Sequence, residues 1–277
     1  MMVWLDGSLL EVRQARVSPL DHGVTVGDGV FETLRAYAGV PFAWSRHAER
    51  LARSARALGL PEPDGDELRA AVEDVLSVNG LDDARVRVTF TGGPAPLGSE
   101  RGHDSPTRMV VAGRFTPWPP TARVAMAPWT RNERGALVGL KTTSYAENVR
   151  ALAFAHERGA DEALLANNRG ELCEGTGSNV FVVADGALRT PPLDAGCLAG
   201  ITRALVLELA ADAGIAVEET ALPADALDAA DEAFITSSTR EVHAIAAVDD
   251  RPLAAPGPVT AKLAAAFSDL VATTPDP

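Results

Sequence analysis

Apolar and polar residues alternate along this chain with two different periods, which predicts a protein built from both helices and strands. Over residues 45–59 and 66–78 the apolar residues recur at helical spacing, as on one face of an amphipathic helix. Over residues 85–90 every second residue is apolar, which is typical of a half-buried strand. Residues 108–114 are predicted to form another strand, and a loop over residues 91–105 joins the two.

The second half of the chain shows short apolar runs between helical patterns. The predicted helices cover residues 145–158, 201–213 and 259–271, the last with a frayed end after it, and the predicted strands cover 162–167, 179–184 and 232–237.

Clustered prolines in TPWPP, residues 116–120, indicate a connection between two domains. We expect a small N-terminal domain at 1–113, a linker at 114–120 and a larger domain at 121–277. The predicted fold class is therefore α+β, with two domains that meet across a cleft, a common place for a ligand.

The composition argues against several classes of protein. A net charge of −13 and an isoelectric point near 4.8 leave no basic surface for nucleic acid. No apolar stretch approaches the roughly 18 residues of a membrane-spanning helix, and the first residues lack a signal-peptide pattern, so we expect a cytoplasmic protein. Cys173 and Cys197 fit neither a disulfide framework nor a metal site, and the scattered histidines predict no metal.

Lys141 is the first residue that suggests chemistry. The chain has 25 basic residues, and apart from Lys141 and Lys262 they are all arginine. A lysine amine can lose its proton when it is desolvated and can form an imine with a carbonyl, neither of which an arginine can do. On composition alone, a surface lysine explains Lys141 as well as a catalytic lysine does, and Lys262 fits the polar face of the last helix.

An acidic residue and a glycine-rich turn follow in EGTGSN at 174–179. Glu174 stands just before the turn, which leads into the apolar strand predicted at 179–184. Alone, this pattern is that of an ordinary tight turn. Its occurrence after Lys141 gives it more weight.

These motifs resemble those of the class IV aminotransferases, the pyridoxal 5'-phosphate enzymes of fold type IV. The matching stretches are GDGVFETLR at 27–35, RHAERL at 46–51, GLKTTSYAENV at 139–149, DEALLANNRGELCEGTGSNVFVV at 161–183, PPLDAGCLAGITR at 191–203 and DEAFITSSTREV at 231–242. The group includes branched-chain and D-amino acid aminotransferases, R-selective amine transaminases and aminodeoxychorismate lyases. The resemblance implies a small N-terminal domain, a larger C-terminal domain and a cofactor cleft between them.

The resemblance implies a role for each matching residue. Lys141 would hold the cofactor aldehyde as an imine and then, once substrate frees it, move the proton between the substrate α-carbon and the cofactor. Glu174 would face the pyridine nitrogen, where a carboxylate keeps the ring protonated and able to accept electrons. Tyr145 resembles a tyrosine that contacts the ring, although a lone aromatic residue is commonly part of a core.

Three stretches could donate hydrogen bonds to the cofactor phosphate, and the resemblance puts all of them there. The residues are Arg50, Ile201, Thr202, Ser237 and Ser238. The arginine has a planar fork suited to an oxyanion. Ile201 and Thr202 stand where a helix is predicted to begin, and the free N–H groups of a helix start can hold an anion. The two serines follow an apolar strand in a hydroxyl-rich run that on its own would suggest a turn.

The residues expected to contact the substrate are Phe31, Arg35, Thr239 and Arg240. Either arginine could bind a substrate carboxylate, and either could equally be paired within the protein. Phe31 matches a family position that lines the substrate pocket, and a core phenylalanine is the alternative.

The reaction within the family stays open. D-amino acid aminotransferases resemble one another in an Arg-x-His in the loop that corresponds to TGGPAPLGSERG, 91–102, and we find no such pair in that stretch. Branched-chain enzymes carry a Tyr-x-Arg near the preceding strand, where this chain reads RVRVTFTGG. We expect an aminotransferase that moves an amino group from a small amino acid, with D-amino acids among the candidates, or from an (R)-amine to a 2-oxo acid.

Two alternatives are retained. Within the family, an aminodeoxychorismate lyase would release pyruvate and 4-aminobenzoate with the same lysine. Outside it, a non-catalytic cofactor-binding protein could keep the scaffold, since a fold does not guarantee a function. The resemblance also implies a homodimer, with small amino and oxo acids as the other partners.

Overall fold

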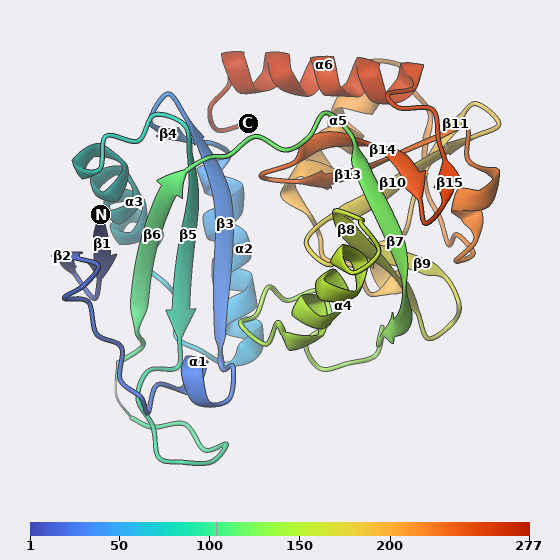
Figure 1. Cartoon of the computed structure of the whole chain (residues 1–277). Helices are drawn as coiled ribbons and strands as arrows, with labels where there is room; N and C mark the ends of the chain where they lie inside the picture. Colours follow the sequence, from blue (N-terminus) through green and yellow to red (C-terminus); the bar gives the residue numbers. More distant parts are fainter. Residues whose placement is uncertain (104) are drawn as a thin grey trace. The chain divides into compact units, whose positions relative to one another are not determined.

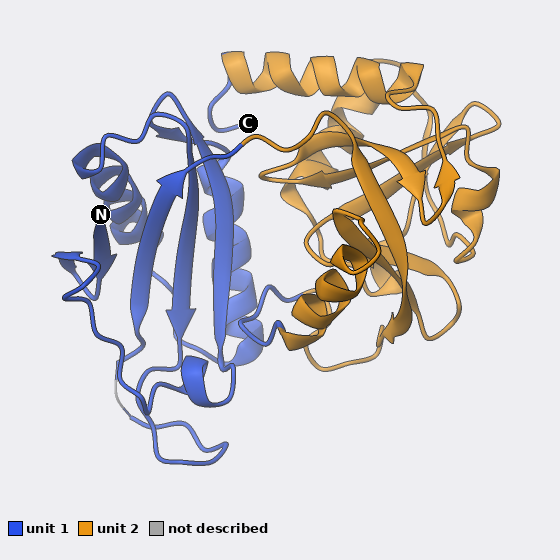
Figure 2. Ribbon diagram, in the orientation of Figure 1, with its two compact units in different colours: residues 1–116, 140–145, 273–277 blue, residues 117–139, 146–272 orange. Residues whose placement is uncertain are grey.

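A computed structural model describes residues 1–103 and 105–277 (Figure 1). Position 104, inside the loop expected over 91–105, lies outside the described residues. The chain forms two compact units (Figure 2). Unit 1 contains Met1–Thr116, Leu140–Tyr145 and Thr273–Pro277, and unit 2 contains Pro117–Gly139 and Ala146–Ala272. The domain bounds expected from the sequence stay a prediction, but the segment that carries Lys141 groups with the N-terminal part of the chain.

Unit 1 is built on a six-stranded antiparallel sheet. Its strands are β1 (Met2–Leu5), β2 (Ser8–Glu11), β3 (Gly29–Tyr37), β4 (Val40–Pro41), β5 (Ala84–Thr91) and β6 (Arg108–Arg114), in the order β2-β1-β6-β5-β3-β4. Its helices are α1 (His22–Thr25), α2 (Trp44–Leu58) and α3 (Gly65–Val78).

Helices α2 and α3 bury their apolar faces against one side of this sheet. The core there joins Val30 and Leu34 of β3 with Val86 of β5, Leu51 of α2 and Val72 of α3, all of them at most 2% exposed. Because successive side chains of a strand point to opposite faces, the odd-numbered residues of β3 and β5 face the other side of the sheet. That second face carries Phe31, Arg35 and Arg87.

Unit 2 is built on a nine-stranded mixed sheet. Its strands are β7 (Ala122–Arg131), β8 (Glu162–Asn167), β9 (Leu172–Gly175), β10 (Asn179–Ala184), β11 (Ala187–Thr190), β12 (Val217–Glu219), β13 (Glu232–Ser237), β14 (Glu241–Val248) and β15 (Arg251–Pro252). The order is β12-β11-β10-β13-β14-β7-β8-β9, with β15 paired to β14. The helical elements are α4 (Ala146–His156), α5 (Ile201–Asp212), α6 (Pro258–Thr273) and the short 3-10 turns Leu193–Ala195 and Ala226–Ala229.

The core of unit 2 lies on both faces of its sheet. On one face Phe181 and Phe234, on neighbouring strands, stack with ring centroids 4.8 Å apart, and Val206 of α5 and Leu263 of α6 cover them. The other face has its own cluster of buried aliphatic residues. Strands covered on both faces read as continuous apolar runs, which is why the sequence predicted them without alternation.

The structure confirms the predicted helices and strands to within about two residues at each end. The expectation of a frayed C-terminal end was wrong. Helix α2 begins after Ala43, which has no side-chain acceptor for the free N–H groups of the first turn. Asp276 supplies it, accepting from the backbone N of Ser45 at 2.9 Å and from its hydroxyl at 2.6 Å, and Pro275 O accepts from Ala43 N at 2.7 Å.

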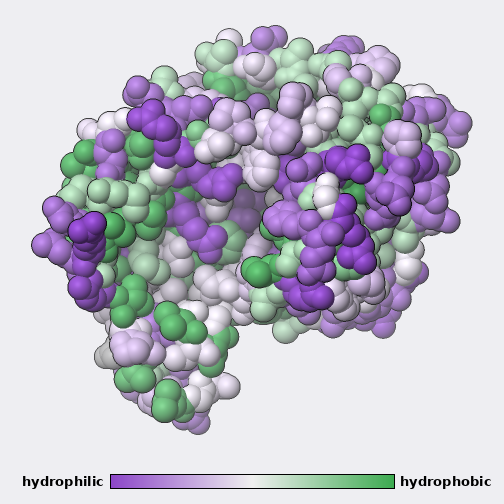
Figure 3. All heavy atoms as spheres, in the orientation of Figure 1, coloured by the Kyte–Doolittle hydropathy of each residue, from purple (hydrophilic) through white to green (hydrophobic). Residues whose placement is uncertain are grey.

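Exposed apolar side chains gather in unit 1 around α1 and the loop after β5 (Figure 3). The largest exposures there are those of Leu97, at 82%, and Val24, at 67%. A patch of this kind is typical of an interaction surface. Within the described part of the chain, no helix combines the length and the hydropathy needed to span a membrane.

Replacing Asp276 by Ala should lower the free energy of unfolding by about 1 kcal/mol, because α2 loses the acceptor that caps its first turn. Urea unfolding followed by circular dichroism measures the change. Asp276→Asn, which keeps one side-chain oxygen, is the matched control and should lose less. Equal stability of the alanine variant and the unchanged protein would show that the cap contributes nothing.

Candidate active site

The segment Leu140–Tyr145 lies beside the start of β3 in unit 1. The backbone N of Phe31 donates to Lys141 O at 3.0 Å, and Thr143 N donates to Gly29 O at 2.8 Å. A side chain at position 29 would press on Phe90 O and on the Thr143 hydroxyl, so glycine leaves room there for both neighbouring segments. The pairing therefore places Lys141 next to Phe31.

Three functional groups surround the ring of Phe31. The Nζ of Lys141 lies 4.7 Å from its centroid, Tyr145 meets it edge-on at 5.2 Å, and the Arg87 guanidinium carbon lies 3.6 Å away. The structure thus brings together three residues that the sequence analysis singled out and one, Arg87, that it missed. Arg87 could have been found from alternation, because it shares a sheet face with Phe31 on the neighbouring strand.

Arg87 belongs to no ion pair among the described residues. Its Nε is 3.4 Å from the Thr89 hydroxyl. Desolvation lowers the pKa of the Arg87 guanidinium, and the nearby Tyr145 partly opposes this effect. A guanidinium that lies against an aromatic ring without a carboxylate is suited to bind an anionic ligand.

Arg50 lies on the face of α2 that contacts β3, and it is clamped by Glu32. The Nε of Arg50 donates to Glu32 Oε1 at 2.8 Å and its Nη2 donates to Oε2 at 2.7 Å, while His47 Nδ1 is 2.7 Å from the same Oε2. All three side chains are at least 95% buried. The sequence did not predict this cluster, although Glu32 breaks the apolar face of β3, and His47 and Arg50 share one face of α2.

The electrostatics of this cluster follow from its burial. Burial alone would raise the pKa of the Glu32 carboxyl, but the Arg50 guanidinium and His47 hold that pKa far below its usual value. Burial lowers the pKa of His47 against the opposing effect of Glu32, so the imidazole is neutral and its Nδ1–H donates to Glu32. Both folded-state pKa values lie below their unfolded values, so the stability from these groups is present at neutral pH and is lost on acidification.

Glu174 lies in unit 2 near the end of β9, with 12% of its side chain exposed. Its Oε2 accepts from the backbone N of Leu198 at 2.9 Å, and its Oε1 is 3.2 Å from the Nε of Arg131. Both carboxylate oxygens are therefore oriented by unit 2 itself. The sequence predicted the Glu174 carboxylate as a site residue but did not predict Leu198 and Arg131 as its partners.

The two unit 2 stretches expected at the phosphate meet around Asn179. Gly200 precedes α5, and its Cα packs so closely on the Asn179 side chain that a Cβ would clash. Among the described residues, no side chain caps the N–H groups at Ile201 and Thr202. Asn179 is paired across the sheet with Thr236, the residue before Ser237. The Thr236 hydroxyl is buried and has no hydrogen-bond partner among the described residues.

Both arginines expected at the substrate have partners inside their own unit. Arg35 donates twice to Asp83, at 3.0 and 3.1 Å, and its guanidinium lies 3.8 Å from the Phe115 ring. Arg240 donates to Asp161 O at 2.8 Å and lies 3.7 Å from the Trp118 ring, whose Nε1 donates to Thr239 O at 2.9 Å. These contacts are those of arginines that hold loops in place.

The loop after β5 contains an Arg-x-His after all. The expectation that this loop lacks the pair was wrong, because Arg101 and His103 have the required spacing at the edge of the stretch 91–102. Arg101 is nevertheless committed within unit 1. It donates twice to Asp28, both at 2.7 Å, and to the carbonyls of Leu58 and Gly59 at 2.6 and 2.8 Å.

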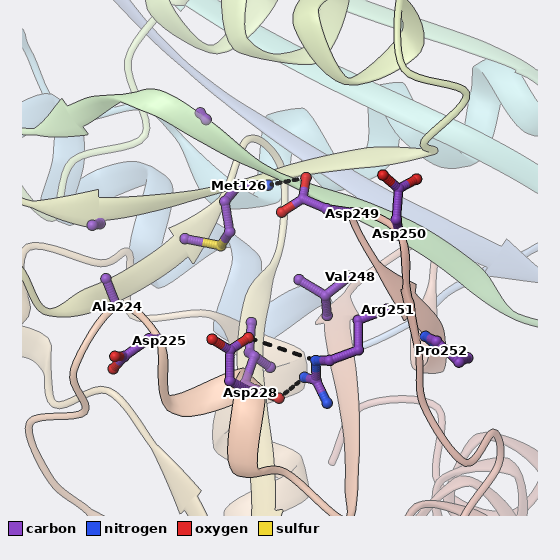
Figure 4. A pocket seen from close by; sticks show the side chains of 12 residues that line it. Met126, Ala224, Asp225, Asp228, Val248, Asp249, Asp250, Arg251 and Pro252 are labelled. Atoms are coloured by element: carbon purple, nitrogen blue, oxygen red, sulfur yellow. Dashed lines mark hydrogen bonds and ion pairs between the residues drawn. The ribbon is translucent and has the colours of Figure 1, made fainter.

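A hollow of about 840 Å³ in unit 2 contains none of these residues (Figure 4). Four aspartates line it: Asp225, Asp228, Asp249 and Asp250. The lone cation there, Arg251, is paired with Asp228 at 3.5 Å. So many carboxylates would repel a phosphate, and we exclude this hollow as the cofactor site. The described residues also contain no cluster of side chains able to hold a metal ion.

The residues present fit pyridoxal 5'-phosphate. Unit 1 supplies the amine that the aldehyde requires, beside an aromatic ring. Unit 2 contains an oriented carboxylate that would suit the ring nitrogen. It also contains a helix start and a buried hydroxyl, the latter without a partner among the described residues, that would suit the phosphate. When it is bound, this cofactor provides the electron sink for amino-group chemistry.

Comparison with known proteins agrees with this chemistry. The family model for amino-transferase class IV matches residues 29–248. A putative branched-chain-amino-acid aminotransferase of Methanocaldococcus jannaschii is 37% identical over 98% of this chain and 96% of that protein. A D-alanine aminotransferase of Bacillus licheniformis is 32% identical over 98% and 97%, and an aminodeoxychorismate lyase of Bacillus subtilis is 32% identical over 87% and 84%.

Solved structures give the same picture. A branched-chain aminotransferase of Thermoproteus uzoniensis, crystallised with norvaline, superposes with a TM-score of 0.92 at 34% identity, covering 98% of this chain and 94% of that one. The T.th. branched-chain aminotransferase with pyridoxamine 5'-phosphate reaches 0.90 at 31% identity, covering 98% and 93%. These matches confirm the α+β fold class and its two-domain layout as fold type IV.

The chain belongs to the class IV aminotransferase family. It is an enzyme that depends on pyridoxal 5'-phosphate and acts on amino and oxo acids.

Replacing Glu32 by Gln should lower the free energy of unfolding by about 3–5 kcal/mol, because Arg50 keeps its buried charge without a charged partner. Urea unfolding at pH 7 measures the loss. Glu62→Gln is the matched control, since Glu62 pairs with Arg56 at the surface, and it should cost about 1 kcal/mol or less. Similar losses in the two variants would contradict the importance given to the buried cluster.

Proposed function

We propose that this protein transfers an amino group between a small aliphatic amino acid and a dicarboxylic 2-oxo acid such as 2-oxoglutarate. The proposal is carried by the ring of Phe31, against which both the Lys141 amine and the Arg87 guanidinium lie. The amine can handle the proton of the reacting carbon, and the guanidinium can bind a carboxylate. The branched-chain aminotransferases among the relatives support an aliphatic substrate.

Lys141 is the proposed catalytic residue. Its amine would attach the cofactor and, when substrate frees it, carry the proton at the substrate α-carbon. Glu174 would face the ring nitrogen of the cofactor. Tyr145, which touches the same phenylalanine ring as Lys141, would contact the face or edge of the cofactor ring.

The proposed phosphate-binding residues are Arg50, Ile201, Thr202, Ser237 and Ser238. The carboxylate of Glu32 would hold the arginine in place for this role, since two N–H groups of that arginine are fixed on it. The free N–H groups at the start of α5 support this role for Ile201 and Thr202. The serines follow a buried hydroxyl that has no partner among the described residues.

For the substrate we propose Phe31 and Arg87 as the main contacts. Arg35, Thr239 and Arg240 were also expected there, but the two arginines have partners within their own units, which favours auxiliary roles for them. Arg101 of the Arg-x-His has four hydrogen bonds within unit 1, which supports the aliphatic amino acid over a D-amino acid trapped by that loop.

Leucine added to the cofactor-loaded enzyme without an amino acceptor should convert the cofactor to its pyridoxamine form. The absorption spectrum of the cofactor measures this conversion, and 2-oxoglutarate should reverse it. Lys141→Ala should slow conversion by about 10²- to 10⁴-fold or more, because the proton carrier is lost. Lys262→Ala, the matched lysine control at the surface, should convert like the unchanged enzyme.

Other outcomes of this experiment would contradict the proposal. Conversion by D-alanine but not by L-leucine would make the protein a D-amino acid aminotransferase. Pyruvate release from aminodeoxychorismate without an amino acceptor would make it a lyase. Failure to form any lysine-bound cofactor would leave only a binding protein.

Arg87→Met should reduce kcat/KM for 2-oxoglutarate by about 10- to 100-fold, the value of one hydrogen bond to a charged group. Transfer to a monocarboxylic aliphatic 2-oxo acid should change by less than about threefold, because that substrate has no second carboxylate to bind. Arg85→Met, on the same strand and the same sheet face, is the control. Equal losses for both oxo acids would show that Arg87 does not bind the second carboxylate of 2-oxoglutarate.

A homodimer also remains a proposal, as the family resemblance implies. The exposed Val24 and Leu97 side chains support it, because unpartnered apolar groups of this size are usually covered in an assembly.

A further inference from the structure

Arg131, the last residue of β7, lies beside the carboxylate expected at the cofactor ring. Only 15% of its side chain is exposed, and its Nε is 3.2 Å from Glu174 Oε1. Its Nη1 also lies 3.6 Å from Glu147, but 81% of that glutamate side chain is exposed, so solvent screens the interaction. Glu174 is thus the main carboxylate that Arg131 meets.

A second set of contacts ties Arg131 to the turn that follows Glu174. The Nη1 of Arg131 donates to Asn148 Oδ1 at 3.0 Å, and the amide of Asn148 donates to Thr176 O at 2.5 Å. Thr176 in turn donates its backbone N to the buried carboxylate of Glu162 at 3.1 Å. The guanidinium therefore has two anchors, Glu174 at its Nε and Asn148 at its Nη1.

The hydrogen-bonding capacity of Arg131 is only partly used. Its Nε and Nη2 are buried and have no hydrogen-bond partner with good geometry in the described part of the chain, although Nε is within ion-pair distance of Glu174. Leaving buried donors unsatisfied costs stability, so such groups in a folded protein call for an explanation. Both donors belong to the guanidinium that lies beside Glu174, so a role of Arg131 at Glu174 would explain why they are kept.

We propose that Arg131 is a positioning residue of the active site, which holds Glu174 ionised and oriented toward the cofactor ring nitrogen. The inference rests on the proposed function in so far as Glu174 faces that nitrogen. It goes beyond that function by assigning a second charged residue to the control of the ring. No residue of the phosphate or substrate contacts is involved.

The physical reason concerns the proton shared between the ring nitrogen and Glu174. That proton can stay on the ring, opposite a carboxylate anion, or move to the carboxylate and leave both groups neutral. A guanidinium against the carboxylate stabilises the anion and so disfavours the second state. Leu198 N–H on the other oxygen acts in the same direction, because a hydrogen bond to the charged form also stabilises it. The ring therefore keeps its proton.

The test uses full-length enzyme loaded with cofactor that is labelled with ¹⁵N at the ring nitrogen. The ¹⁵N resonance reports how much of the ring is protonated, independently of turnover. In Arg131→Met the resonance should move toward the unprotonated position, and the cofactor should bind about tenfold more weakly, since the carboxylate loses its support. Arg134→Met is the matched control, because Arg134 is three residues away with 83% of its side chain exposed, and it should change neither quantity.

A double-mutant cycle shows whether Arg131 acts through Glu174. Glu174→Gln alone should shift the resonance, and adding Arg131→Met to it should cause little further change in the resonance or in cofactor affinity. Additive effects would mean that Arg131 acts elsewhere, and an unchanged resonance in Arg131→Met would overturn the proposal outright. Arg131→Lys, which keeps the charge and is milder for folding, should shift the resonance less than methionine does.

Failure of the inference can be told apart from failure of the proposed function. Borohydride reduction and peptide mass analysis locate the lysine that carries the cofactor. Cofactor on a residue other than Lys141, or no shift in Glu174→Gln, would defeat the proposed function. Cofactor on Lys141 with a shift in Glu174→Gln and none in Arg131→Met would defeat only the role of Arg131.

Discussion

The backbone pairing between Lys141–Thr143 and the start of β3 is the contact on which the unit 1 part of the site depends. Two hydrogen bonds fix it, Phe31 N to Lys141 O and Thr143 N to Gly29 O. Because side chains leave a strand in strict alternation, this register determines which residues share the surroundings of the lysine amine. A shift of one residue would exchange Phe31 for its neighbour Glu32, whose carboxylate is committed to α2.

Each unit uses an arginine beside a buried carboxylate, but for different ends. In unit 1 the pair of Glu32 and Arg50 is almost fully buried and bidentate, which fixes the arginine. In unit 2 the pair of Glu174 and Arg131 is looser and leaves guanidinium donors unsatisfied, and here the carboxylate is the group that is oriented. A buried ion pair contributes little net stability compared with apolar packing, so such pairs are better explained by the geometry that they impose.

The position of an arginine in the sequence is a poor guide to its function in this chain. Arg35, Arg101 and Arg240 all bind groups of their own unit, and each holds a loop or strand end. Arg87 differs because no carboxylate among the described residues pairs with its guanidinium, and the Phe31 ring beside it does not neutralise the charge. These four arginines differ in the neighbours that the fold gives them. Their residue type and their local sequence do not distinguish them.

Sequence alone determined the helices and strands and the family, and it singled out Lys141 and Glu174 as the candidate lysine and carboxylate of the site. It could do so because periodic burial and short motifs are local properties of the chain. It missed Arg87, the partners of Glu174 and the anchoring of the C-terminal residues on α2, and it left Arg35 and Arg240 without assigned partners. Those features were decided by tertiary structure, because the partner of a charged group or a free N–H is whatever distant segment the fold brings within about 3 Å of it.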